Sequence, residues 1–291
     1  MRIEEALSKF ASQLNADGRS THTIRQYQRH VRRLATWAAG NDHSGDVTDL
    51  THEDLASFLS SSEARLRPDG KPKKSSSMNG LRSSLRGFFR YAHRAGYIEA
   101  DPSRLVRRAQ CGTPPPSTLS AEEQAKLLEA LSQSNDVRDR RDSALIQLLL
   151  GTGLRLGSVV ALNVEDIDLE RAEIRVRKTK GDQPERVITG QRTTDVLRDF
   201  VGDRKSGSLF RSRGEDRIST RQVQRRLNHW LREAGIDRPV SAHSLRHSFA
   251  TDLYRKTGDV LLVKEALRHR SITSTLVYVR FDENRLRRAL A

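Results

Sequence analysis

The side chains best suited to chemistry are concentrated in the last quarter of the chain. His243 and Arg246 stand three residues apart, so they share one face if this segment is helical. His269 follows them, and Tyr278 comes nine residues later. A guanidinium can hold two phosphate oxygens at once, and a tyrosine hydroxyl can act as a covalent nucleophile. We therefore predict that these four side chains converge on a phosphodiester that Tyr278 attacks.

Two further candidates lie upstream. Arg155 follows an apolar helix over residues 144–150 and a pair of glycines, so we expect it to be held at the edge of the core rather than in solvent. Residues 174–177 and 185–188 are predicted to form the strands of a β-hairpin. Its turn carries Lys178 and Lys180, and periodicity leaves both open as the donor that protonates the departing sugar oxygen. Arg177 is a poorer donor, because a guanidinium gives up its proton reluctantly.

With these residues in place, the chain resembles the tyrosine recombinase (phage integrase) family, and in size it is nearest to the compact Xer-like members. The resemblance extends from about Ser20 to the end of the chain, and its motifs occur in the family's order. They are Gly-Thr-Gly-Leu-Arg155, the Lys180 hairpin, His243-x-x-Arg246-His247, Leu-x-His269 and Tyr278. The resemblance implies a site-specific recombinase that cleaves and rejoins DNA through a 3′-phosphotyrosyl intermediate, to integrate, excise or resolve DNA. It implies no cofactor and no metal.

The resemblance also assigns roles. The implied catalytic residues are Arg155, Lys180, His243, Arg246, His269 and Tyr278. The family's Lys-Thr-Lys arrangement favours Lys180 over Lys178. His243 is the expected proton acceptor from Tyr278, whereas His247 lies one step round the helix and is expected to support the site.

Two positions depart from the family pattern. Ser158 stands where the family usually has Glu, and Arg268 stands where it usually has Gly. Neither change touches a reacting group, so an active enzyme is still predicted. A zinc site built from His243, His247 and His269 is disfavoured, because the neighbouring arginine would repel a cation.

The charge of the chain favours a polyanionic partner. Its 291 residues carry a formal net charge of +15. Residues 1–117 hold 19 Lys+Arg against 12 Asp+Glu, and residues 118–291 hold 33 against 25, so both parts are basic. This balance suits two domains that close around double-stranded DNA. One cysteine, Cys111, and no apolar run long enough to span a bilayer lead us to expect a cytoplasmic protein without a membrane partner.

The expected fold is mainly α-helical with a small β-hairpin or sheet. Residues 1–111 are predicted to form an N-terminal helical, SAM-like core-binding domain, with helices over 3–14, 21–37, 51–59 and 76–95. A proline-rich linker spans 112–118. Residues 119–291 are predicted to form a mixed α/β catalytic domain of the tyrosine-recombinase type. Its remaining helices are expected from Ser120 to Leu131 and over 193–200, 220–234, 243–256 and 260–267, with a short one at Tyr278.

Arginines repeated every four residues form stripes on two N-terminal helices, and such stripes suit a DNA backbone. A further helix begins with Arg and Gln, which can contact base edges. The predicted DNA-binding residues are Arg25, Arg29, Lys73, Lys74, Arg82, Arg86, Arg90, Arg221, Gln222 and Arg225.

The segment around Tyr278 is rich in β-branched residues, which are mediocre helix formers, so a marginal helix could move the tyrosine in and out of the site. We expect the tail over residues 282–291 to dock on a neighbouring protomer in a cyclic tetramer on DNA, formed with like chains or with a sister recombinase. Two rival functions remain: a type IB topoisomerase-like nicking enzyme, and a catalytically silent DNA-binding regulator.

Overall fold

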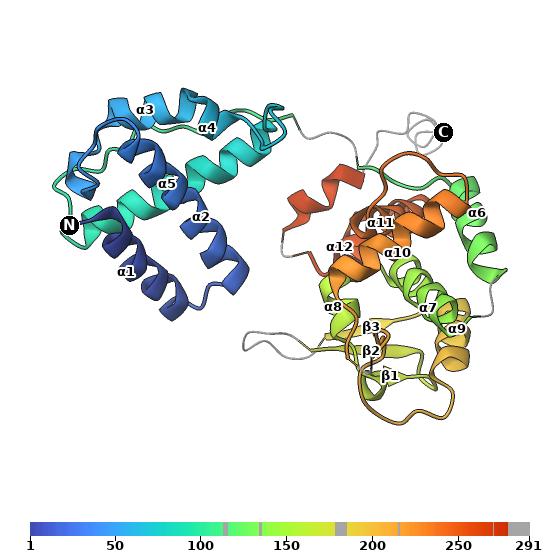
Figure 1. Cartoon of the computed structure of the whole chain (residues 1–291). Coiled ribbons are helices and arrows are strands. Elements are labelled where there is room, and N and C mark those ends of the chain that lie inside the picture. Colours follow the sequence, from blue (N-terminus) through green and yellow to red (C-terminus); the bar gives the residue numbers. More distant parts are fainter. Residues whose placement is uncertain (113–115, 134–135, 178–184, 215, 270, 279–291) are drawn as a thin grey trace. The chain divides into compact units, whose positions relative to one another are not determined.

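The computed structural model describes residues 1–291 except 113–115, 134–135, 178–184, 215, 270 and 279–291. The chain forms two compact units, residues 1–113 and 114–291 (Figure 1). Both are mainly helical, and the second adds a small antiparallel sheet, so the predicted fold class is confirmed. Lys178, Lys180 and the tail over 282–291 lie outside the described residues.

The first unit is a helical cluster around one apolar core. Its helices are α1 (Ile3–Ala16), α2 (Thr21–Ala39), α3 (His52–Ser60), α4 (Ser62–Arg65) and α5 (Ser75–Arg94), with a 3₁₀ turn at Val47–Asp49. Leu7, Leu34, Leu55 and Phe88 are each fully buried. The sequence prediction missed α4, a single turn that begins at the cap residue Ser61.

Helices α2 and α5 pack closely against each other. A Cβ added at Gly87 of α5 would lie 2.7 Å from the Tyr27 ring of α2, so only glycine fits there. One turn earlier, His30 and Ser84 form a buried 2.8 Å hydrogen bond between the same helices. This contact fixes the two helices that carry the predicted arginine stripes.

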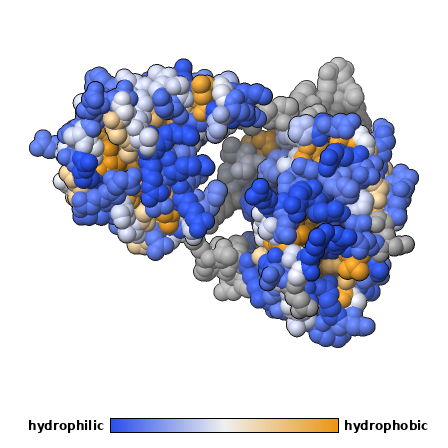
Figure 2. Space-filling view, in the orientation of Figure 1, coloured by the Kyte–Doolittle hydropathy of each residue, from blue (hydrophilic) through white to orange (hydrophobic). Residues whose placement is uncertain are grey.

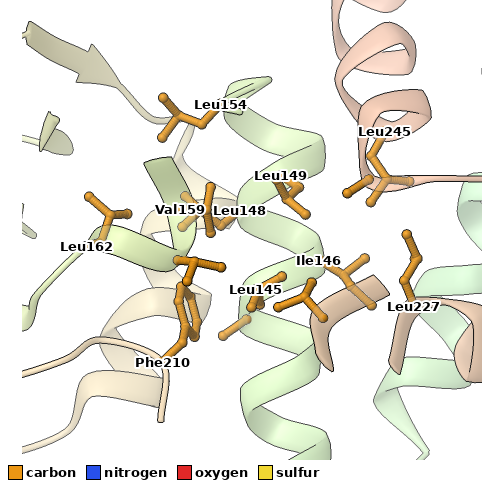
Figure 3. Close-up of a cluster of buried hydrophobic side chains, with 14 of the residues drawn as sticks. Leu145, Ile146, Leu148, Leu149, Leu154, Val159, Leu162, Phe210, Leu227 and Leu245 are labelled. Carbon is orange, nitrogen blue, oxygen red and sulfur yellow. The ribbon is translucent and has the colours of Figure 1, made fainter. Parts of the chain in front are cut away.

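The second unit is built around α7. Its helices are α6 (Ala121–Ser132), α7 (Val137–Thr152), α8 (Leu156–Ala161), α9 (Gln191–Val201), α10 (Thr220–Glu233), α11 (Ala242–Thr257) and α12 (Val260–Leu267), with 3₁₀ turns at Val164–Asp166, Ile272–Ser274 and Leu276–Tyr278. Figure 3 shows leucines of α7 pointing to both sides, toward Val159 and Phe210 on one and toward Leu227 and Leu245 on the other. Burial all round α7 makes it the central helix of the unit.

Helix α7 begins seven residues before the predicted apolar segment, within a charged stretch. Asp142 there is buried because it accepts hydrogen bonds from Arg141 at 2.6 Å, from Arg226 and from the Trp230 indole at 3.1 Å. A buried carboxylate is tolerated when such partners satisfy it. This pairing across the fold could not be seen in local periodicity.

The sheet has three antiparallel strands in the order β1 (Ile167–Asp168), β2 (Glu173–Val176) and β3 (Glu185–Ile188). Ile174 pairs with Ile167 on one side and with Val187 on the other. Strands β2 and β3 form the predicted hairpin, and the segment with Lys178 and Lys180 connects them in sequence. Strand β1 was not predicted, because two residues are too few for an alternating pattern to appear.

Candidate active site

The beginning of α11 is fixed from two directions. Ser241 caps the helix with a capping box that also involves Ser244. The Gln224 side chain of α10 accepts a hydrogen bond from the Ala242 amide at 3.1 Å and donates one to the Val240 carbonyl at 3.3 Å. The capping box and the Gln224 side chain therefore fix the start of α11, whose first two turns carry His243, Arg246 and His247.

Arg246 is buried and oriented by backbone carbonyls. Its Nη1 donates to the Gly153 oxygen, and its Nη2 donates to the Leu267 oxygen at 2.6 Å. Burial lowers the Arg246 pKa to about 10, with a further contribution from the charge of Arg155 and an opposing one from Tyr278. The guanidinium therefore stays charged at neutral pH and has a fixed direction.

Gly153 makes this arrangement possible. Its φ of 60° lies in the left-handed region, and a Cβ there would lie 2.3 Å from the Phe249 ring and 3.0 Å from Leu267. The glycine ends α7 and presents its carbonyl to Arg246. The Gly-Thr-Gly-Leu-Arg motif thus has a structural reason as well as a chemical one.

Arg155 lies at the N-cap of α8, and its side chain is exposed. The expectation that it is held at the core edge was therefore wrong; buried Leu154 occupies that position instead. The positive charge of Arg155 still lowers the pKa of Arg246, His243 and His269, so it lies close to all three.

Tyr278 is buried, with 5% of its surface exposed, and it packs against Ala250, Val263 and Leu267. Its hydroxyl forms a 2.6 Å hydrogen bond with Nδ1 of His247. Burial raises the Tyr278 pKa, and the charge of Arg246 acts in the opposite direction. The residue closes a 3₁₀ turn, Leu276–Tyr278, rather than the short helix that was expected.

His243 and His247 lie one turn apart on α11, and their rings meet edge to face with centroids 4.3 Å apart. Partial burial, followed by the charges of Arg246 and Arg155, lowers the His243 pKa. Burial and then the groups at His243, Arg246 and His269 lower the His247 pKa to about 4. Both imidazoles are therefore neutral at neutral pH in the free protein.

His269 follows α12, and a hydrogen bond of 2.9 Å joins its Nδ1 to the hydroxyl of Thr275. Thr275 is fully buried, and its carbonyl accepts the Tyr278 amide at 3.0 Å. Burial and then the charges of Arg246 and Arg155 lower the His269 pKa to about 4. Thr275 thus links the third imidazole to the tyrosine, a connection that sequence reasoning missed because threonine there looked like one more β-branched residue.

The two departures from the family pattern lie close to the site. Arg268 caps α12 in the left-handed conformation, with φ 53°, and its guanidinium donates to the Arg186 carbonyl of β3. Ser158 is half-buried in the first turn of α8, and its amide donates to the Arg155 carbonyl at 2.9 Å. The start of β3, next to the segment that connects β2 and β3, is therefore tied to the segment that carries His269.

Of the three candidate proton donors, only Arg177 lies among the described residues. Lys178 and Lys180 lie outside the described residues. Arg177 is paired at 2.8 Å with Asp166 and at 3.6 Å with Glu165. This pairing directs the Arg177 guanidinium to two carboxylates rather than to a leaving oxygen.

The predicted DNA-binding residues are mostly surface side chains. Figure 2 shows strongly hydrophilic residues over α2 on the face in view. Arg25, Arg29, Lys74, Arg90, Arg221 and Arg225 are exposed, and Lys73, Arg82, Arg86 and Gln222 are half-buried. Three of them have structural partners: Lys73 donates to the Ala64 carbonyl, Arg82 donates to the Asn79 side chain at 3.3 Å, and Gln222 forms the capping box with Ser219.

Burial and the positive charges of Arg33 and Arg29 lower the Lys73 pKa, so the three cations form one cluster between α2 and the start of α5. Within the described ranges, no group of three or more His, Cys, Asp or Glu side chains is arranged to hold a metal ion. None of the helices that the structure describes is long and apolar enough to cross a membrane.

Tyr278 and Arg246 thus lie in one part of the second unit with His243, His247 and His269. Comparison with known proteins identifies the family. Residues 117–285 match the phage integrase family, and residues 7–96 match the family's N-terminal SAM-like domain. The chain belongs to the phage integrase family and is a tyrosine-type site-specific recombinase.

Its relatives include named Xer proteins. The chain is 31% identical to tyrosine recombinase XerC of Chromobacterium violaceum, over 96% of this chain and 91% of that protein. It is also 31% identical to XerA of Thermococcus kodakarensis, over 98% and 94%. Among solved structures, XerH bound to a palindromic difH substrate after cleavage superposes with a TM-score of 0.75 at 25% identity, covering 96% of this chain and 84% of that one.

Proposed function

We propose that this recombinase cuts DNA with Tyr278, whose hydroxyl attacks the scissile phosphorus while the 5′-oxygen leaves. A 3′-phosphotyrosyl bond stores the energy, and a second 5′-hydroxyl reverses the step on a new partner. One observation supports this proposal above all. The Tyr278 hydroxyl bonds His247 and feels the charge of Arg246, and His243 and His269 lie near His247.

Each proposed catalytic residue has a role that its environment supports. The backbone bonds to Arg246 leave its remaining N–H groups free to hold a phosphate oxygen, and exposed Arg155 can approach from solvent. His243 and His269 would donate hydrogen bonds to the same phosphate. Lys180 would protonate the leaving oxygen. Charge on the phosphate grows in the transition state, so donors held in advance lower the barrier.

We also propose double-stranded DNA and further protomers as partners. XerH is solved on a DNA substrate, and lambda integrase is solved as a tetramer on a Holliday junction. On this chain, the charge cluster of Arg29, Arg33 and Lys73 and the arginine-rich faces of α2 and α5 would contact the DNA backbone. The partner protomers would be copies of this chain or a sister recombinase in a cyclic tetramer. The single cysteine and a DNA substrate support a cytoplasmic location.

A nicked suicide substrate tests the proposal, because loss of the short fragment traps the covalent intermediate. Wild-type protein should give a DNA adduct, and Tyr278→Phe should bind the same DNA but give none. An adduct that persists in Tyr278→Phe would assign the nucleophile elsewhere.

Strand-exchange and supercoil-relaxation assays, together with the adduct assay, separate the rival functions. Strand exchange between two sites is expected for a recombinase, whereas a topoisomerase-like enzyme would relax supercoils without exchange, and a silent regulator would form no adduct. The Xer relatives favour the first outcome.

A further inference from the structure

The tyrosine hydroxyl and one particular imidazole are already in contact. Nδ1 of His247 lies 2.6 Å from the Tyr278 oxygen, and the two ring centroids are 5.4 Å apart. His243 meets the His247 ring, and no hydrogen bond joins His243 to Tyr278 within the described part of the chain. The imidazole that touches the reacting oxygen is therefore not the one that the sequence favoured.

The direction of this hydrogen bond follows from burial. Tyr278 is almost fully buried, so its hydroxyl proton needs an acceptor inside the protein. A neutral imidazole has one acceptor nitrogen, and Nδ1 is the nitrogen within reach. The tyrosine thus donates to Nδ1, and the His247 proton resides on Nε2.

We propose, on the basis of the function proposed above, that His247 is the proton acceptor for Tyr278 and that DNA binding activates it. As the Tyr278 oxygen–phosphorus bond forms and the phosphorus–O5′ bond breaks, the phenolic proton moves to Nδ1. The leaving oxygen takes a different proton, from Lys180. In the return step the imidazolium gives its proton back to the tyrosine oxygen, so His247 ends as it began.

Activation by DNA follows from the charges around His247. Burial, and then the groups at His243 and Arg246 on α11 and at His269 after α12, disfavour a positive charge on His247 in the free protein. A bound phosphodiester brings negative charge among these groups, and the transition state adds more. An opposite charge within a few ångströms favours the protonated imidazole. The base therefore gains strength only when a phosphate is in place, which protects the tyrosine from wasteful ionisation.

His247→Asn provides the sharpest test, because the amide oxygen replaces the Nδ1 acceptor but cannot hold a proton. The variant should bind DNA as wild type does and form the adduct on the order of 10²- to 10⁴-fold more slowly, the usual contribution of a general base. A rate within about threefold of wild type would overturn the proposal.

A substrate with sulfur in place of the bridging 5′-oxygen then locates the defect. A thiolate leaves without a proton, so the substrate should rescue Lys180→Ala but not His247→Asn. Rescue of His247→Asn would place the imidazole at the leaving group and refute the assignment. Wild-type adduct formation is measured in parallel. Absence of the wild-type adduct would contradict the proposed function, whereas rescue of His247→Asn would contradict only the role of His247.

A third measurement does not depend on how well the His247 variant folds. His243→Asn should lower the cleavage rate. Its rate should still fall toward acidic pH as the wild-type rate does, because His247 still titrates. Loss of this fall in rate at acidic pH in His243→Asn would make His243 the proton acceptor.

Discussion

At the scale of single residues, the main feature of the site is the hydrogen bond between the Tyr278 hydroxyl and Nδ1 of His247. His243, Arg246, His269 and Tyr278 gather in one place in the structure. Helix periodicity does not say which of two imidazoles one turn apart the tyrosine hydroxyl contacts, and the family pattern favoured His243 over His247. Likewise, Arg155 occupies the N-cap position of α8 and is exposed rather than held at the core edge.

Gly153→Ala should destabilise the second unit by about 2–4 kcal/mol, since it combines a strained left-handed residue with overpacking against Phe249. Urea unfolding followed by Trp230 fluorescence in a Trp37→Phe background would measure it. Gly157→Ala is the matched control: a Cβ there meets nothing within 4 Å, and alanine should stabilise α8 slightly. Equal losses at the two glycines would contradict the packing explanation.

The pH dependence of the first unit should report His30. Burial and the charges of Arg29, Arg33 and Lys73 lower its pKa to about 4. Between about pH 6.5 and 4 the unfolded chain therefore binds the extra proton and the folded chain does not, so stability should fall as the pH falls through this window.

The measurement is urea unfolding at about pH 7 and pH 4.5 in Trp230→Phe, which leaves Trp37 as the reporter. His30→Asn keeps a donor toward Ser84 but does not titrate, so its stability should change less between the two pH values. An unchanged difference would exclude His30 as the source.

At the scale of elements, most helices were predicted with ends within two residues of those observed, because cap residues such as Thr51 and Ser120 can be recognised in the local sequence. The exceptions depend on distant partners. Asp142, in the charged part of α7, is buried among partners that include Arg226 and Trp230 of α10. The turn at Tyr278 is 3₁₀ because Thr275 uses its side chain to bond His269 and its carbonyl to bond the tyrosine amide.

Because Arg268 ends α12 in the left-handed conformation, Arg268→Gly should affect stability and DNA cleavage differently. Arg268→Gly removes a backbone strain of about 1 kcal/mol, so the second unit should be no less stable than wild type. It also removes the bond to the Arg186 carbonyl of β3, so DNA cleavage should be slower. Cleavage rates and unfolding curves of the same preparations test both expectations.

Arg268→Ala is the comparison, because it loses the same bond but keeps the strain. It should be about 1 kcal/mol less stable than the glycine variant. A glycine variant that cleaves at the wild-type rate would show that the tie to β3 has no catalytic role.

At the scale of the whole molecule, basic charge on both units predicts DNA binding that weakens steeply with salt. Arg29→Ala should lower the slope of log affinity against log salt by about 1, the value for one lost phosphate contact. Arg32→Ala on the same helix is the control, because Arg32 is directed to Glu4 of α1 at 3.5 Å. A flat salt dependence in wild type would contradict the electrostatic basis of binding.

Removal of the chain from Asp282 onward tests the predicted docking tail. The truncated protein should bind a single DNA site with wild-type affinity and still form the tyrosine adduct, because every proposed reacting group precedes residue 282. Recombination between two sites should fall if the tail joins protomers. Recombination at the wild-type rate would rule out a docking role.

The proposed nucleophile is also part of a hydrophobic cluster, since the Tyr278 ring packs between α11 and α12. Losing the aromatic ring would therefore injure the fold and not only the chemistry. In a lineage that no longer needed to cut DNA, loss of the Tyr278 hydroxyl would cost little stability, whereas loss of the ring would cost much more. Descendants that had become inert would be expected to carry phenylalanine at this position rather than a small residue.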